Sequence, residues 1–175
     1  MKQYNRVMLG EHGMYIKDCL EKSYIGANFI EDIDLNNTPF NHEDVWRQEM
    51  ITKYLEYHRE KSVQTARNCI GFLWTICFGL KCDDIVLASN GNGGYHVGEI
   101  DGNYYYMSGS ELPHRRSVVW KNIVIQRRLM SQKLQNSTGS IGTCCNITKY
   151  SEEIEWLNRG GPGTSVPYHD WVKSQ

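Results

Sequence analysis

The spacing of apolar residues changes along the chain and predicts helices in the first half and mainly strands in the second. Trp46, Met50, Ile51, Tyr54 and Leu55 recur at helical spacing, and a stronger set follows over residues 63–77. The first helix is expected to begin after Asn41 and to end near Glu60. Ser62 is placed to cap the second helix, and Gly79 to end it in a left-handed conformation.

From Asp84 onward the apolar residues alternate with a period of two, which is typical of strands. Strands are predicted over 85–87, 95–100, 103–107, 116–124 and 141–147, and Asp101-Gly102 is predicted as a two-residue hairpin turn. Short strands near 6–9 and 24–30 precede them. The expected fold class is therefore α+β: a strongly curved, mostly antiparallel sheet or a small open barrel, with helices packed around it.

One domain over residues 1–158 accounts for all of these elements, and 175 residues suffice for a packed core. After Arg159 the run Gly-Gly-Pro-Gly-Thr-Ser-Val-Pro is typical of a linker, so residues 159–175 are expected to lead toward an effector domain outside this sequence. No apolar run approaches the roughly 20 residues of a membrane span, and no signal peptide is recognisable. We therefore expect a cytoplasmic protein with no membrane partner.

Charge is distributed unevenly in a chain whose net charge is only −1. Residues 112–151 contain seven of the 19 Lys and Arg residues and no Asp or Glu, so the remaining 12 basic residues share the rest of the chain with all 20 acidic ones. This asymmetry favours a surface that faces a polyanion, although a basic strand and helix that are merely solvated would give the same pattern. The basic residues expected to bind phosphates are Arg115, Arg116, Arg127, Arg128 and Lys133.

Few residues suggest catalysis or metal binding. None of the lysines follows an acidic residue or Gln by two positions, so the usual metal-dependent nuclease pattern is missing. The six cysteines and six histidines lack the spacing of metal ligands, and buried reduced thiols are expected, with a thiol nucleophile left open. The glycine-rich run 90–94 precedes a strand rather than a helix, which favours a loop over a phosphate cradle. We expect no catalytic residue, metal or cofactor.

Aromatic residues interleaved with basic ones offer a way to read a nucleobase, which needs a ring to stack on and a hydrogen-bonding edge. Asn28 is a candidate for the edge contact, although a hydrogen bond at the end of its strand would also account for it. The candidates for the ring, most of which also fit a hydrophobic core, are Phe29, Trp74, Tyr95, Tyr104, Tyr106 and Trp120. Trp74 lies beside the apolar stripe of its predicted helix, where it could reach the rim of a pocket.

Four segments together resemble one known family: residues 24–29 (YIGANF), 94–106 (GYHVGEIDGNYYY), 112–120 (LPHRRSVVW) and 134–140 (LQNSTGS). In this order and spacing they resemble the N-terminal specificity domain of Mrr-like and McrB-like restriction proteins, which belongs with the EVE, YTH and PUA-like folds. The resemblance covers about residues 6–157. The sequence departs from the usual pattern at residues 107–111 and in the long helix at 41–60.

This resemblance implies a pocket for a base flipped out of the strand, often a methylated base, and no chemistry in the domain itself. Asn28, Phe29 and Trp74 would wall the pocket, with Ser89 and Tyr95 near its mouth. The residues implied to face the nucleic-acid backbone are His114, Arg115, Arg116, Asn136 and Ser137.

The leading hypothesis is thus a DNA-binding module that reads a methylated or hydroxymethylated base by base flipping and targets a fused or associated restriction nuclease against phage DNA. Two alternatives remain open. The chain could be an RNA-binding module, because PUA-like and YTH folds also serve RNA, or it could sense a free nucleotide or small ligand.

Overall fold

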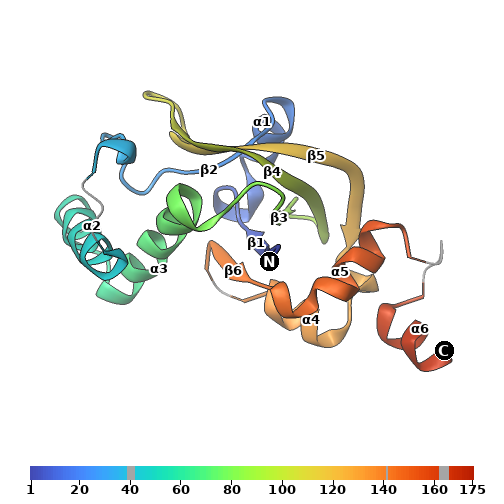
Figure 1. The fold of residues 1–175 in the computed structure, drawn as a ribbon. Coiled ribbons are helices and arrows are strands. Elements are labelled where there is room, and N and C mark those ends of the chain that lie inside the picture. The colour runs from blue at the N-terminus through green and yellow to red at the C-terminus, as the bar shows by residue number, and fades with distance from the viewer. Residues whose placement is uncertain (39–41, 141, 162–165) are drawn as a thin grey trace.

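A six-stranded mixed sheet forms the centre of the molecule (Figure 1). The computed structural model describes residues 1–38, 42–140, 142–161 and 166–175. The strands are β1 (Tyr4–Val7), β2 (Tyr24–Ala27), β3 (Ile85–Ser89), β4 (Gly94–Tyr106), β5 (His114–Gln126) and β6 (Cys144–Asn146). Their order in the sheet is β2-β5-β4-β3-β1-β6, so the sheet is open, with β2 and β6 at its edges.

The strand pairs are antiparallel except for β1 and β3, which run parallel. The prediction of an α+β fold with a mostly antiparallel sheet is therefore confirmed, and the sheet does not close into a barrel. The parallel pair follows from the connection between its strands, because α1, β2, α2 and α3 all lie between β1 and β3 in the chain.

Helices cover the sheet in two groups (Figure 1). They are α1 (Ile16–Glu21), α2 (Glu43–Tyr57), α3 (Val63–Trp74), α4 (Gln132–Thr138), α5 (Ser151–Asn158) and α6 (Tyr168–Ser174), with a π-helical turn, η3 (Thr75–Gly79), continuing α3. Helices α2 and α3 lie together at one end, and α4, α5 and α6 lie at the other. No helix in the described ranges is long and apolar enough to cross a bilayer.

The central strand β3 is buried on both faces, which explains its uninterrupted apolar sequence. Val86 and Ala88 pack into the core beneath α2 and α3, whereas Ile85 and Leu87 pack into a second core beneath α4 and α5. Successive side chains of a strand point to opposite faces, so one strand serves both cores. A continuous apolar run therefore marks the middle of this sheet.

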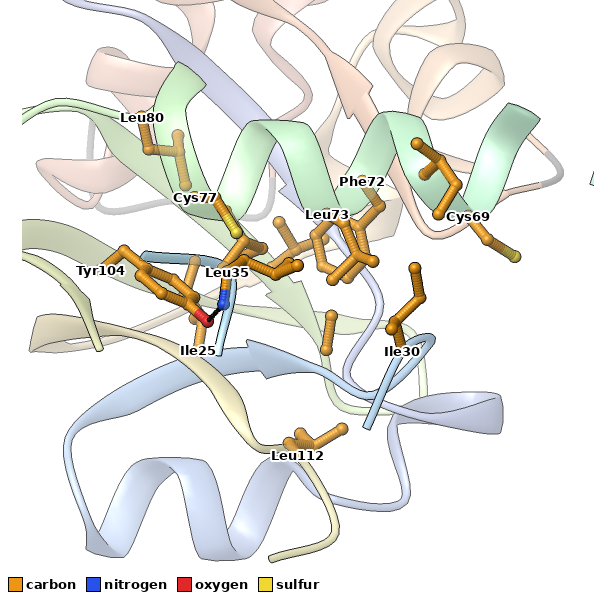
Figure 2. Packing of buried hydrophobic residues seen from close by; sticks show 14 of the residues in the cluster. Ile25, Ile30, Leu35, Cys69, Phe72, Leu73, Cys77, Leu80, Tyr104 and Leu112 are labelled. Atoms are coloured by element: carbon orange, nitrogen blue, oxygen red, sulfur yellow. Dashed lines mark hydrogen bonds between the residues drawn. The ribbon is translucent and has the colours of Figure 1, made fainter. Parts of the chain in front are cut away.

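The first core is formed by α3 and η3 against β2 and the segments around it (Figure 2). Phe72, Leu73 and Cys77 point from the helix toward Ile25, and Leu35 lies among them. The backbone N–H of Leu35 donates a hydrogen bond of 3.3 Å to the hydroxyl of Tyr104. This bond attaches the segment that contains Leu35 to strand β4. These contacts explain why the strongest helical periodicity in the sequence belongs to α3.

The predicted hairpin turn at Asp101-Gly102 is wrong. Strand β4 runs through these residues without reversing and pairs with β5 on both sides of them, as Ile100 with Val118 and Tyr104 with Arg116, with a register shift between the two pairs. The chain reverses later, over residues 107–113, where Met107 N–H donates to the carbonyl of Pro113 at 2.8 Å. The Asp-Gly pair therefore forms an irregularity within a long strand rather than a turn.

The predicted helix boundaries are confirmed in part. The Ser62 hydroxyl caps α3 by accepting a hydrogen bond of 3.1 Å from the N–H of Thr65. Gly79 is not left-handed, because η3 ends instead with a bond of 2.9 Å from Leu80 N–H to Thr75 O. The predicted cap Asn41 lies outside the described residues.

The segment predicted as a linker contains a short helix that packs against the domain. The rings of Tyr168 and Trp171 in α6 lie 5.3 Å and 5.4 Å from the ring of Trp156 in α5, centroid to centroid. The described part of this tail is therefore attached to α5 through three aromatic rings.

The cysteines are free, and Cys19, Cys69 and Cys77 are buried as expected. Cys144 and Cys145 point to opposite faces of β6, since Cys144 packs against the first core and Cys145 against the second. Cys82 is exposed, which differs from the expectation that all of the thiols are buried.

Candidate functional site

The residues expected to form one base pocket are distributed over several places. Asn28 and Phe29 line one cleft, and Trp74 lines a different cleft that adjoins it. Ser89 lies at the end of β3, where its hydroxyl accepts a hydrogen bond of 3.2 Å from Gly91 N–H. Tyr95 is buried in the second core. The single pocket implied by the resemblance is therefore not formed, but three of its five residues line neighbouring clefts.

The basic segment at the start of β5 is buried, contrary to the expectation that it would face a nucleic-acid backbone. The exposed fractions of His114, Arg115 and Arg116 are 0%, 6% and 4%. The Tyr104 hydroxyl lies 2.8 Å from Nδ1 of His114, and Nε2 of His114 lies against the carbonyl of Ile30. His114 thus connects β4 to the chain after β2 and has no surface to offer a ligand.

Both neighbouring guanidinium groups also have internal partners. Arg115 donates from Nε to the carbonyl of Leu112 at 2.7 Å, and its guanidinium lies 3.7 Å from the centroid of the Tyr24 ring. Arg116 donates a longer bond of 3.4 Å to Ile76 O, and its Nε has no partner. Burial lowers the pKa of Arg116 from its usual value. These side chains are enclosed within the fold and do not form a phosphate-binding surface.

The position of β5 in the sheet explains this burial. The strand lies between β2 and β4, so His114 pairs with Ala27 on one side and with Tyr106 on the other. These neighbours satisfy the edges of the strand, and its start is covered by the segment after β2, by the Tyr24 ring and by η3, as the contacts with Ile30, Tyr24 and Ile76 show. The basic residues at its start are therefore enclosed, whereas the end of the strand reaches the surface.

The other basic and polar candidates lie after β5, on or before α4. Arg127 is half-buried and donates to Gln135 O at 3.1 Å, and Ser137 forms a hydrogen bond of 2.9 Å with the Tyr150 hydroxyl. Arg128, Lys133 and Asn136 are exposed. Only some of the basic residues in the acid-free stretch 112–151 therefore contribute positive charge to the surface.

A polar cleft lies between α3 and the edge of the sheet formed by β1 and β6, with a volume of about 510 Å³. We call it the Arg67 cleft. Helices α2 and α3 contribute Arg47, Arg67, Asn68, Phe72 and Trp74. Strands β1 and β6 contribute Asn5, Cys144 and Asn146, and Gln3 lies just before β1. None of the described residues that line it is acidic, so the cleft offers amides and guanidinium groups without a competing carboxylate.

The pairing of β1 with β6 places two amides on the same wall of this cleft. Asn5 pairs with Asn146 across the antiparallel strands, and both lie on the face turned toward α3. Arg6 points to the opposite face, where its guanidinium donates to the carbonyls of Ser140 and Gly142 at 2.6 Å each. Arg6 thereby holds the loop that leads into β6 and closes one side of the cleft.

The two guanidinium groups of the Arg67 cleft differ in their partners. Arg47 forms an ion pair of 2.7 Å with Glu43 and lies 5.6 Å from the centroid of the Trp74 ring. Arg67 is exposed and makes no hydrogen bond or ion pair with the residues that the structure describes. Arg67 is therefore the cation of this cleft that is available to a ligand.

A buried amide of the cleft also lacks a partner. Asn5 is 4% exposed, and its Nδ2 makes no hydrogen bond. An unpaired buried donor costs about 1–3 kcal/mol. Because this Nδ2 is itself enclosed, a ligand in the cleft could reach it only after the side chain turned.

A second, mostly apolar cleft of about 370 Å³ adjoins the first, and we call it the Asn28 cleft. Its lining includes Met8, Glu11, Met14, Ala27, Asn28, Phe29 and Leu112. Phe72 and Thr143 line both clefts, so the two share a wall. The ring of Phe29 packs edge-on against those of Tyr54 and Phe72, with centroids 6.4 Å and 6.1 Å apart, which fixes its position.

A third hollow differs in charge. Glu31, Asp32 and Glu111 line a cavity of about 570 Å³ beside the loop that joins β4 to β5. Three carboxylates disfavour an anionic ligand there. Within the described ranges no three His, Cys, Asp or Glu side chains are grouped as metal ligands would be.

Sequence reasoning did not identify Asn5, Arg67 and Asn146. Arg67 lies on the polar face of a strongly periodic helix, where an arginine is ordinarily solvated, and the two asparagines lie 141 positions apart in the chain. Only the pairing of β1 with β6 brings these amides together. The one local signal was Trp74, which the sequence puts beside the apolar stripe of its helix and which is half-buried in the lining of this cleft.

The comparisons with known proteins identify a family but no activity. No curated protein matches the chain. A family described as a domain of unknown function (DUF8426) matches residues 6–148, a range that includes Asn28, Arg67 and Asn146. The match covers most of the chain and all of the sheet beyond the first two residues of β1. The chain therefore belongs to the DUF8426 family.

Proposed function

We propose that this chain is a non-catalytic module that binds nucleic acid and holds one of its nucleotides in the Arg67 cleft. The observation that carries this proposal is the guanidinium of Arg67. It lies without an ion pair beside the exposed amides of Asn68 and Asn146, in a cleft whose described lining has no carboxylate. A nucleotide needs a cation for its phosphate and donors and acceptors for the edge of its base.

The cleft supplies these groups from different elements. Arg67 on α3 would contact the phosphate, and on the opposite wall the exposed Asn146, whose Oδ1 accepts a hydrogen bond from Thr148 N–H, would donate from its amide nitrogen to the base edge. Trp74 would contact the base through its ring edge or through the stacked Arg47, because that guanidinium already lies over the ring. Stacking contributes about 1–3 kcal/mol per base, which offsets the few kcal/mol that unstacking costs.

The same cleft offers little for catalysis. Its described lining has no carboxylate or imidazole to act as a general base. Burial raises the pKa of the Cys144 thiol to about 12, so this cysteine is protonated and a poor nucleophile at neutral pH. These features favour binding without a chemical step.

The finer form of the proposal is that the nucleotide carries a methylated or hydroxymethylated base in DNA, and that the module directs a restriction nuclease to it. Its support is the resemblance of four sequence segments to restriction specificity domains and PUA-like folds. Preferential binding of RNA would replace this proposal with an RNA-binding module, and binding of a free nucleotide alone would replace it with a small-ligand sensor.

Fluorescence anisotropy with short single-stranded oligonucleotides tests the proposal. The probes are DNA with and without methylated or hydroxymethylated bases, RNA of the same sequence, and a mononucleotide as competitor. We expect Arg67→Ala to weaken binding about five- to tenfold and to reduce the dependence on salt by about one released ion, because one phosphate contact is lost.

Arg59→Ala is the matched control, since Arg59 is exposed in the connection between α2 and α3 and lies outside the cleft. It should leave both the affinity and the salt dependence unchanged. Equal binding by wild type and Arg67→Ala, or the failure of every oligonucleotide and of the mononucleotide to bind, would contradict the proposal.

A further inference from the structure

We infer that the Asn28 cleft is a second subsite that takes the base of the adjacent nucleotide, so that the ligand spans at least two linked nucleotides. This inference rests on the proposed function of the Arg67 cleft and extends it to the neighbouring cavity. The two clefts meet at Phe72 and Thr143, which line both. The clefts are therefore neighbours, and a ligand that occupies both would pass over Phe72 and Thr143.

The lining of the Asn28 cleft fits a flat, uncharged group. Met8, Met14, Phe29 and Leu112 provide apolar surface, and Met14 is 64% exposed at the rim. Methionine side chains adapt to planar ligands and contact aromatic rings favourably. A volume of about 370 Å³ lies within the range of small-ligand pockets.

One polar side chain in this lining is available for recognition. Asn28 is half-buried, and its amide makes no hydrogen bond with the described residues. An amide presents both donors and an acceptor, which matches the mixed edge of a nucleobase. The apolar surroundings strengthen such a bond by excluding water.

The charged side chains of the two clefts indicate where the phosphate and the second base of the ligand would bind. Glu11 is the carboxylate in the described lining of the Asn28 cleft, and it makes this cleft unfavourable for a phosphate. Arg67 lies in the other cleft. A dinucleotide would therefore place its phosphate toward Arg67 and the second base beside Asn28, with Phe72 between the two subsites.

A length series distinguishes one subsite from two. Titrations use a 5′-phosphorylated mononucleotide, the corresponding dinucleotide, and a dinucleotide in which one unit is abasic. We expect the dinucleotide to bind about tenfold more tightly than the mononucleotide, and the abasic unit to remove this gain, because base contacts are worth about that much.

Asn28→Ala should remove the gain while leaving mononucleotide binding intact, whereas Arg67→Ala should weaken the binding of both. Asn122→Ala, at an exposed position of β5 outside both clefts, is the matched control and should change neither. In the wild-type protein, the side-chain amide signals of Asn28 in a nitrogen–proton NMR spectrum should shift with the dinucleotide and not with the mononucleotide. This spectrum keeps the test decisive if Asn28→Ala does not fold.

Equal affinity for the mononucleotide and the dinucleotide, or Asn28 signals that do not move, would overturn the second subsite and leave the proposed function standing. Failure of the mononucleotide, the dinucleotide and the oligonucleotides to bind would overturn both.

Discussion

The basic residues at the start of β5 and the basic residue of the Arg67 cleft have similar side chains but differ in their exposure to solvent. His114, Arg115 and Arg116 lie at the start of a central strand and are buried, whereas Arg67 lies on an exposed helix face beside an open cleft. The buried set was the more conspicuous in the sequence because it lies in a long stretch without acids. The comparison shows that the segments packed over a basic residue, and not the local density of charge in the sequence, decide whether that residue is exposed.

The buried set also differs in how its charges are accommodated. No ion pair involves these residues in the described part of the chain, and their partners are carbonyl groups and an aromatic ring. Removing a guanidinium from water without a carboxylate is costly, and hydrogen bonds to carbonyls recover only part of that cost. The start of β5 is therefore a place where stability is sensitive to small changes.

The largest effect is expected for His114→Ala, which leaves the Tyr104 hydroxyl and the Ile30 carbonyl short of a partner inside the core. The free energy of unfolding should fall by about 3 kcal/mol, as measured by urea denaturation. Lys133→Ala is the control at an exposed basic site and should change it by less than about 0.5 kcal/mol. Equal effects of the two substitutions would show that β5 is not the enclosed region.

Replacing Arg116 with Met should have a smaller effect in the opposite direction. Methionine has a similar length, fills the same space and removes the unpartnered Nε, so the free energy of unfolding should rise by about 1–2 kcal/mol. Arg128→Met, at an exposed position, should leave it nearly unchanged. A loss of stability in Arg116→Met would mean that the buried charge is stabilised by its surroundings. The difference between the buried basic residues and Arg67 would then lie in exposure alone.

The smallest expected effect is the pH dependence of the free energy of unfolding. Burial lowers the pKa of His114 below its ordinary value of 6.5, and it lowers that of His96 for the same reason. Below pH 6.5 the unfolded chain therefore binds more protons than the folded chain. The contribution of these groups to stability is complete above pH 6.5 and is lost as the pH falls through the lowered pKa.

Urea denaturation at pH 7.5 and at pH 5.5 measures this change. Wild type should be less stable at the lower pH, and His114→Gln should show a smaller difference between the two values because only His96 remains. A difference of the same size in His114→Gln would mean that His114 does not titrate in this range.

Much of the fold followed from the sequence because its signals are local. The periodicity of α3, its Ser62 cap and the apolar run of β3 each depend on residues close together in the chain. The Asp101-Gly102 turn failed because pairing with β5 on both sides keeps β4 extended, and that pairing joins distant segments. For the same reason the sequence could not show that Asn5 and Asn146, which are far apart in the chain, line the same cleft as Trp74.

The aromatic contacts between α5 and α6 limit the reach of the end of the chain. A free linker of the same composition would let its far end explore a wide volume, whereas Trp156, Tyr168 and Trp171 hold α6 on the domain surface. A fluorophore or fusion partner joined after Gln175 would therefore start from the flank of α5. The fluorescence emission of Trp156 and Trp171 should change when α6 separates from α5.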